Sequence, residues 1–305
     1  MTVTVYDGDK TAALEAAQTE ITALEKLISV TGENSDIYKL DHNGGKPFDV
    51  SYETSELLSF ALDMNKKTDG ALDITLYNVL REWGFTTGDY KVPSDETIEA
   101  LLENTGCENV DIRENTVTLN NNVSVDLGSV GKGEAGDRVI KVLKENGVSS
   151  ALLDLGGNIQ TLGTKPDGTL WKIAIRDPSG GEGSIAKIEV ADRAVITSGG
   201  YERYFTGDDG EVYWHILDPK TGRPARNGIL SATVIGKSGR LCDALSTSLF
   251  VMGEQKAVDY WKNSADAFDM ILVTSDGRVL VTKGIYNNFT LYDEYSSALR
   301  VEMIE

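Results

Sequence analysis

The chain has 305 residues, of which 40% are hydrophobic and 25% charged, a composition typical of a globular protein long enough to bury a large core. Its formal net charge of −19 argues against nucleic acid and anionic lipid as ligands, because both require a basic surface. No apolar run in the sequence is long enough to span a bilayer.

The N-terminal half of the chain shows both strand and helix patterns. Residues 2–7 alternate in the manner of a strand, and apolar residues at helical spacing predict a helix over 11–28. Three further helices are expected over residues 52–70, 71–85 and 93–106. Gly70 is expected to close the first of these three, and Ser94 to cap the last. Short strands separated by Asn-rich turns are expected over residues 108–112, 116–119 and 123–127.

The C-terminal half is richer in strand patterns. A helix over 131–146, entered through a glycine loop, precedes them. The strands are expected over residues 151–155, 159–163, 170–177, 185–190, 194–198, 211–218 and 229–236. Two helices over 241–253 and 254–264 and a hairpin over 269–284 follow. Because helices and strands do not alternate strictly, we expect an α+β fold with mixed or antiparallel sheets and packed helices, as one domain over residues 1–305.

The two cysteines, Cys107 and Cys242, lie far apart in the sequence and form no Cys-x-x-Cys pair. We interpret them as small buried residues rather than as metal ligands or a redox centre. A disulfide between them remains open at this stage.

The segment VDLGSVGKGEAGDRV, residues 125–139, reads as a strand, a glycine loop and a helix. Glycines allow close backbone approach, and a helix N-terminus favours an anion, so this segment could hold a phosphate. Lys132 could meet that anion, and Asp126 could accept hydrogen bonds. A tight turn between strand and helix explains the same glycines without a ligand.

Asp243 and Thr247 are four residues apart in an expected helix, which puts their oxygens on one face. A carboxylate and a hydroxyl in this arrangement suit a hard cation such as Mg²⁺. The alternative is an Asp placed near a helix start and a Thr that fills a packed face.

His215, one of two histidines, ends an aromatic strand and precedes the turn Asp-Pro-Lys-Thr-Gly. An imidazole with a pKa near neutrality is a suitable general base, although a histidine bonded to backbone in a rigid turn fits the pattern equally well. Asp73 lies between apolar residues, where a carboxylate needs a partner.

Six stretches taken in order resemble the ApbE-like FAD:protein FMN transferases over nearly the whole chain. They are TDGALDIT, DLGSVGKGEAGD, LLDLGGNI, TSGGYERYF, HILDPKTGRPA and DALSTSLFVMG. The resemblance implies an α+β fold with internally duplicated motifs. It also implies a Mg²⁺-dependent enzyme that moves FMN from FAD to a Thr or Ser hydroxyl of an acceptor flavoprotein subunit, through a phosphoester bond, with release of AMP.

The resemblance also assigns residues. Asp243, Thr247 and the backbone carbonyl of Ser129 are the implied metal ligands. The implied FAD contacts are Ala71, Leu72, Asp73, Asp126, Lys132 and Leu217. His215 is the implied base for the acceptor hydroxyl. Family members often act outside the cytoplasmic membrane, some as lipoproteins, so an extracytoplasmic location is expected although this chain shows no leader.

The chain departs from the family pattern at two positions. Thr31 stands where an aromatic residue is common, and Gly200 stands where an Asp is frequent.

Two rival functions fit the same residues. One rival is a Mg²⁺-dependent FAD pyrophosphatase that gives FMN and AMP. The other is a flavin-binding protein without turnover, which would not need His215.

Overall fold

The computed structural model describes residues 1–181 and 183–305. The chain divides into two compact units. The first unit comprises Met1–Ile21, Lys132–Tyr201 and Arg226–Glu305, and the second comprises Thr22–Gly131 and Glu202–Ala225. Helices α1 (Lys10–Ile28) and α6 (Gly128–Glu145) pass from one unit to the other. The single domain over residues 1–305 stays a prediction.

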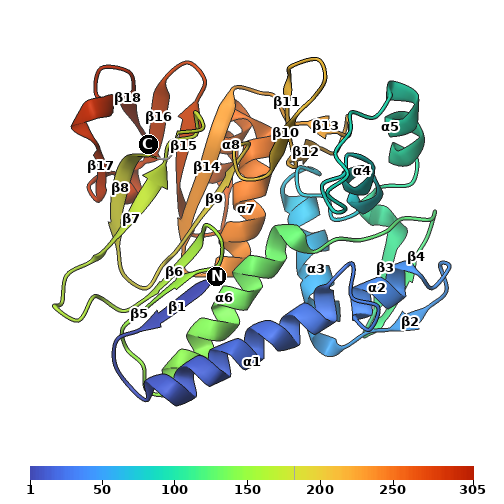
Figure 1. Ribbon diagram of the computed structural model, residues 1–305, viewed down its shortest axis with the longest axis horizontal. Coiled ribbons are helices and arrows are strands. Elements are labelled where there is room, and N and C mark those ends of the chain that lie inside the picture. The colour runs from blue at the N-terminus through green and yellow to red at the C-terminus, as the bar shows by residue number, and fades with distance from the viewer. Residues whose placement is uncertain (182) are drawn as a thin grey trace. The chain divides into compact units, whose positions relative to one another are not determined.

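An eight-stranded sheet is the centre of the first unit (Figure 1). In spatial order its strands are β1 (Thr2–Val5), β5 (Ala151–Asp154), β6 (Asn158–Leu162), β9 (Ala194–Gly199), β14 (Ile229–Gly236), β15 (Phe268–Thr274), β16 (Arg278–Thr282) and β18 (Arg300–Ile304). Neighbouring strands are antiparallel except β16 and β18, which are parallel. The predicted α+β fold with a mixed sheet is therefore confirmed, whereas the duplicated motif stays a prediction.

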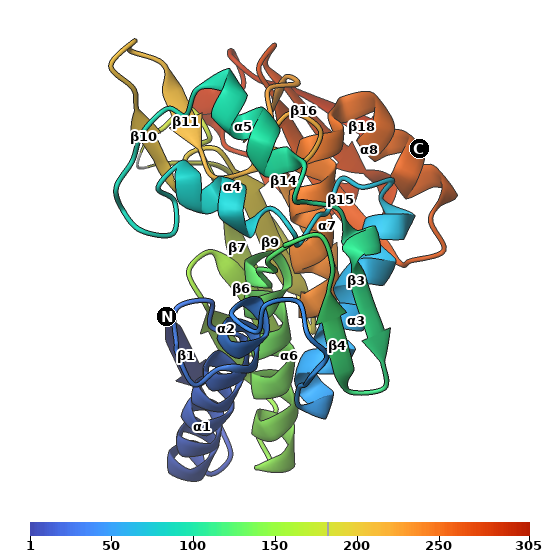
Figure 2. The ribbon, with the colours of Figure 1, turned by 90° about the vertical axis from the view of Figure 1, so that its right-hand side faces the viewer.

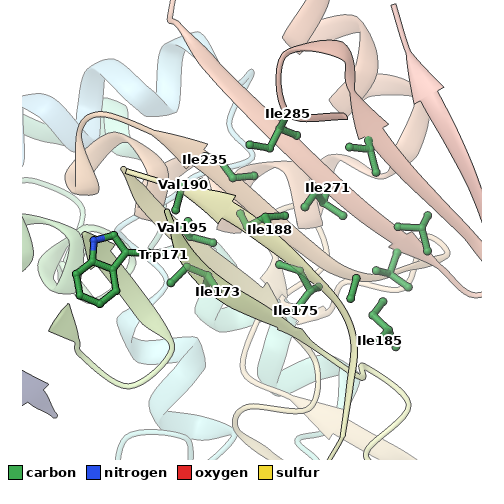
Figure 3. Close-up of a cluster of buried hydrophobic side chains, with 14 residues drawn as sticks. Trp171, Ile173, Ile175, Ile185, Ile188, Val190, Val195, Ile235, Ile271 and Ile285 are labelled. Atoms are coloured by element: carbon green, nitrogen blue, oxygen red, sulfur yellow. The ribbon is translucent and has the colours of Figure 1, made fainter. Parts of the chain in front are cut away.

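The central strands of this sheet are apolar and buried on both faces, because other elements cover them. Helix α7 (Gly239–Met252) packs on β14 and β9, and α8 (Glu254–Asn263) packs on β15 (Figure 2). A second sheet of β7 (Trp171–Arg176), β8 (Ser184–Val190) and β17 (Phe289–Leu291) contributes Ile173, Ile175 and Ile188 to a buried cluster with Ile235 and Ile271 (Figure 3). Burial of such side chains contributes about 1.5–3 kcal/mol each.

The remaining faces of the first unit are closed by short helices and by α1 and α6. Ala13 and Ala17 of α1 and Val139 and Leu143 of α6 pack with Leu153 of β5. The contacts of Val139 and Leu143 with Leu153 hold the C-terminal part of α6 on the sheet.

Helix α9 (Lys283–Tyr286) follows β16, and a 3₁₀ helix over Asp293–Tyr295 precedes β18.

The second unit is built from short helices and small sheets. Its helices are α2 (Asp36–Asp41), α3 (Tyr52–Lys67), α4 (Tyr77–Glu82), α5 (Asp95–Leu102) and a 3₁₀ turn over Cys107–Asn109. Its strands form the sheets β2 (Phe48–Asp49)–β4 (Thr116–Leu119)–β3 (Val110–Arg113), β10 (Tyr204–Thr206)–β11 (Val212–Trp214) and β12 (Leu217–Asp218)–β13 (Arg223–Pro224). Trp83, Phe85, Ile98 and Leu217 belong to its buried core.

Four of the expected elements were wrong in part. The helix expected over 71–85 is helical only over Tyr77–Glu82, because Asp73 accepts hydrogen bonds from Thr75 and so forms a turn. Residues 123–127 are not a strand and make only the isolated bridge between Leu76 and Ser124. Helix α6 begins at Gly128, so most of the expected glycine loop is helical.

The strand expected over 211–218 is interrupted at His215, which lies in a bend between β11 and β12. Both cysteines are buried free thiols, as we interpreted them, and no disulfide joins them. Within the described part of the chain, no helix has the length and apolar character needed to cross a membrane.

Candidate functional site

Asp243 of α7 is a buried carboxylate in the first unit, with only 4% of its surface exposed. Burial raises the pKa of Asp243 to about 6, and the charge of Lys132, the N–H groups of Gly133 and Lys132, and the amide of Asn158 oppose that rise. The Gly133 N–H donates to Oδ2 over 2.8 Å. The carboxylate is therefore largely ionised at neutral pH.

Glycines bring α6 close enough to α7 for this contact. A Cβ atom on Gly133 would lie 2.2 Å from the carbonyl oxygen of Gly239, so only glycine fits there. Asp137 of α6 also caps α7: it accepts hydrogen bonds from the Ser238 hydroxyl and from the N–H groups of Gly239 and Arg240. The α6 glycines thus serve helix packing as well as any ligand.

Thr247 lies one turn after Asp243 on α7 and is half-buried. Its Oγ1 is 3.3 Å from the hydroxyl of Ser198 on β9, and the Ser198 hydroxyl lies 2.8 Å from that of Ser246. Asp243 and Thr247 thus present a carboxylate and a hydroxyl from successive turns of one helix.

These donors fit Mg²⁺ in kind, since magnesium prefers hard oxygen ligands. An ionised buried carboxylate and a hydroxyl also explain why Lys132 and several N–H groups surround the position. Among the described residues, no three or more His, Cys, Asp or Glu side chains gather in a way that could hold a metal. Backbone and substrate oxygens would therefore have to complete the coordination shell.

Asp126 and Ser129 lie at the start of α6 in the second unit. The Gly128 N–H donates to Asp126 Oδ1 over 2.7 Å, so this carboxylate caps the helix rather than ending a strand. Burial raises the pKa of Asp126, and the Gly128 N–H and the charge of Arg203 lower it. Lys132 lies in α6, within the helix expected over 131–146.

Ala71, Leu72 and Asp73 form the turn between α3 and α4 in the second unit. Leu72 is buried, and its N–H donates to Thr68. Asp73 Oδ1 accepts from the N–H and hydroxyl of Thr75 over 2.7 and 2.5 Å, which supplies the partner that the sequence required. The N–H of Asp126 donates to the carbonyl of Ile74, so this turn lies beside the α6 start.

His215 is held by the residue that precedes β10. Its N–H donates to the Arg203 carbonyl over 3.1 Å, and its Nδ1 lies 3.2 Å from the same oxygen. The Phe85 ring packs edge-on against the imidazole at 6.3 Å. The turn that follows is anchored by Trp83, whose Nε1–H donates to the carbonyl of Gly222 over 2.8 Å. Leu217 lies in the buried core beside Trp83.

Each unit therefore gathers part of the predicted set. The first unit brings together Asp243, Thr247 and Lys132. The second places Asp126 between the turn of Ala71, Leu72 and Asp73 and the residue Arg203, which holds His215.

Three residues near these positions were missed from the sequence. Asn158 is fully buried beside Asp243. It lies in the stretch LLDLGGNI, and the sequence pattern did not single it out. Arg203 stands in TSGGYERYF, where its role depends on folding. Asp41 is the last residue of α2 and belongs to none of the six motifs. Its Oδ1 accepts a hydrogen bond from the Val125 N–H over 2.9 Å. Burial raises the pKa of Asp41 to about 7.

Comparisons with known proteins agree with one another. The model of the ApbE family matches residues 1–272. Proteins named FAD:protein FMN transferase from Vibrio cholerae and Escherichia coli are 35% identical over 268 residues and 30% identical over 280 residues. The first alignment covers 84% of this chain and 80% of the relative, the second 88% and 80%.

Solved structures give the same result. The ApbE protein of Thermotoga maritima matches with a TM-score of 0.82 and 32% identity, over 98% of this chain and 94% of that one. The Pseudomonas stutzeri flavinyl transferase ApbE matches with a TM-score of 0.79 and 29% identity, over 97% and 92%.

Proposed function

The chain belongs to the ApbE family, and we propose that it transfers FMN from FAD to a Thr or Ser hydroxyl of its acceptor protein in a Mg²⁺-dependent reaction that releases AMP. That it is an FAD:protein FMN transferase, with FAD as substrate and a protein as acceptor, follows from its relatives. The metal, the acceptor hydroxyl and the residue roles below are the proposal.

In the first unit, Asp243 and Thr247 would hold Mg²⁺, and Lys132 would contact the FAD diphosphate. The bound ion would supply positive charge at the phosphoryl oxygens. Such compensation is needed because FAD is anionic and the chain carries a net charge of −19. The observation that carries this assignment is the buried Asp243 carboxylate, which presents its oxygens one helical turn before the Thr247 hydroxyl.

The Ser129 carbonyl would be the third protein ligand to the metal. The family resemblance assigns it this role, and the residue lies in the first turn of α6.

In the second unit, Ala71, Leu72, Asp73, Asp126 and Leu217 would contact FAD. His215 would take the proton of the acceptor hydroxyl while that oxygen attacks the phosphorus of the FMN phosphate. The bond between this phosphorus and the AMP oxygen breaks, and its electron pair leaves with AMP. Each atom of FAD is thus accounted for in flavinylated protein and AMP.

His215→Gln tests the base directly, because glutamine keeps polarity but cannot accept the proton. We expect kcat for FMN attachment to fall about 10²–10⁴-fold while FAD binding, measured by flavin fluorescence, stays within about twofold. An unchanged rate would remove His215 from this role. His42→Gln, a substitution of the other histidine, is the matched control and should match wild type.

The physiological acceptor and location are also proposals that rest on the family resemblance. We propose a flavoprotein subunit of a redox complex as the acceptor, and a site of action outside the cytoplasm.

A further inference from the structure

We propose that Phe85 and Arg203 fix the imidazole of His215 as the Nδ1–H tautomer, so that Nε2 is the atom that accepts the proton of the acceptor hydroxyl. Arg203 and Phe85 are then positioning residues for the transfer. This inference rests on the proposed role of His215 as the base.

The tautomer follows from the atom that faces Nδ1. That atom is the backbone carbonyl oxygen of Arg203 at 3.2 Å, and a carbonyl oxygen can only accept a hydrogen bond. Nδ1 must therefore carry the hydrogen. A neutral imidazole has one N–H and one lone pair, so the lone pair is on Nε2.

The backbone strengthens this contact. The N–H of His215 donates to the same carbonyl oxygen over 3.1 Å, so His215 is joined to Arg203 through both its main chain and its ring. This bond continues the ladder of β10 and β11, in which Tyr204 pairs with Trp214. The β10–β11 ladder therefore fixes part of the position of this carbonyl, and the bond that the Arg203 side chain makes fixes the rest.

Arg203 is in turn attached to Phe85. Its guanidinium donates a hydrogen bond to the Phe85 carbonyl oxygen, and a charged donor makes such a bond stronger than a neutral one. Phe85 is 3% exposed and packs against the rings of Trp83 and Phe205. A buried aromatic cluster thus anchors the guanidinium.

The Phe85 ring completes the arrangement. It meets the imidazole at 6.3 Å with an interplanar angle of 64°, an edge-on geometry that opposes rotation of the His215 ring. Phe85, Arg203 and His215 therefore each contact the other two. A half-turn of the ring about the Cβ–Cγ bond would put Cδ2 in the place of Nδ1, which would break the Nδ1 bond and disturb the ring contact.

During transfer, Nε2 of His215 takes the hydroxyl proton, and the imidazolium keeps its Nδ1–H on the Arg203 carbonyl. The acceptor oxygen forms the new bond to the FMN phosphorus, and the electron pair of the broken bond leaves with AMP. The proton on Nε2 then passes to solvent, which restores the starting tautomer.

Nitrogen NMR tests the tautomer without any substrate. The chain has two histidines, so ¹⁵N-labelled His42→Gln protein shows one imidazole. At alkaline pH, we expect long-range ¹H–¹⁵N spectra to give a protonated Nδ1 and an Nε2 with a lone pair. The opposite tautomer, or an even mixture of both, would overturn the proposal.

Substitutions of Arg203 test the positioning role. Arg203→Met should yield a mixture of tautomers and lower kcat for FMN attachment about 10–100-fold, with the circular dichroism spectrum unchanged. Arg203→Lys keeps a charged donor and should restore most of both properties. Arg223→Met removes a guanidinium that pairs with Asp95 in the same unit, and should match wild type.

The outcomes distinguish a failure of the positioning inference from a failure of the proposed function. If wild type attaches FMN but His215 carries its hydrogen on Nε2, or if Arg203→Met keeps both the tautomer and kcat, the positioning inference fails alone. If wild type attaches no FMN to acceptor while the Nδ1–H tautomer is present, the proposed function fails instead.

Discussion

Asp243 combines two properties that rarely occur together, deep burial and a largely ionised state at neutral pH. Burial alone would favour the protonated form. Lys132 and the Gly133 N–H, both of α6, and Asn158 of β6 counter this effect. Taking a carboxylate out of water costs free energy, and these neighbours offset part of that cost.

Asp243→Asn should test this residue as a metal ligand. The amide can still accept from the Gly133 N–H, but it lacks the charge that attracts Mg²⁺. We expect the Mg²⁺ concentration that gives half-maximal FMN transfer to rise at least about tenfold. Asp259→Asn, on the exposed face of α8, is the matched control. Equal Mg²⁺ dependence in all three proteins would exclude Asp243 as a ligand.

Asp41 predicts a pH dependence of stability in the second unit. Its pKa rises from 3.8 to about 7 on folding, because of burial and the nearby charge of Asp126. The native state therefore binds more protons than the unfolded state between these values, and its stability falls as pH rises from about 4 to about 7. Among the described residues, Asp41 Oδ2 makes no hydrogen bond that would offset ionisation.

Asp41→Asn removes this titration and keeps an acceptor for the Val125 N–H. Compared with wild type, we expect the variant to gain on the order of 1–3 kcal/mol in free energy of unfolding between pH 5 and pH 8, measured by urea denaturation. Asp63→Asn, on exposed α3 surface, should not show this gain. Parallel curves for wild type and Asp41→Asn would contradict the assignment.

At the scale of elements, the approach of α6 to α7 sets the geometry around Asp243. Gly133 meets Gly239 backbone to backbone, and Asp137 caps the start of α7. The contact between the two helices therefore requires glycine at position 133 and a carboxylate one turn later, at Asp137.

Gly133→Ala should force these helices apart. Because the new Cβ would lie 2.2 Å from a backbone oxygen that cannot rotate away, we expect the free energy of unfolding to fall by about 1–3 kcal/mol in chemical denaturation. Gly181→Ala is the control, since its Cβ would come no closer than 3.5 Å to any atom outside its chain neighbours. A Gly133→Ala protein as stable as this control would show that the helices have room to move.

Periodic patterns predicted the long helices and strands. Side-chain hydrogen bonds and glycine packing set the elements that the patterns did not predict. The helix over 11–28 is confirmed, with its buried residues at helical spacing, and the strand over 229–236 is confirmed, with nearly every residue buried. The region around Asp73 was misjudged because a side-chain hydrogen bond there replaces a helical one. The glycine-rich start of α6 was interpreted as a loop because the role of its glycines in helix packing, such as the contact of Gly133 with Gly239, is invisible in the sequence.

The same limit applies to the site. Residue type and spacing singled out Asp243, Thr247 and His215, the family resemblance gave them roles, and the structure adds the surroundings of each. Arg203 and Asn158 could not be chosen from the sequence, because their significance lies in contacts with residues far along the chain: Arg203 with Phe85, and Asn158 with Asp243.

At the scale of the whole molecule, an acidic chain must hold an anionic substrate. With a net charge of −19, no general attraction brings FAD to the protein. Binding therefore depends on local sources of positive potential, namely Lys132, the N–H groups near Asp243 and a divalent cation. This requirement is the strongest physical reason to expect metal dependence.

Mass spectrometry of an acceptor protein tests the central claim most directly. The purified chain is incubated with FAD, Mg²⁺ and an acceptor domain carrying the target hydroxyl, with and without chelator. We expect the acceptor to gain the mass of one FMN less one water, with one AMP released per acceptor, and no gain when the metal is chelated. Release of free FMN and AMP at the same rate without acceptor, and no mass gain with it, would contradict the account and indicate a pyrophosphatase.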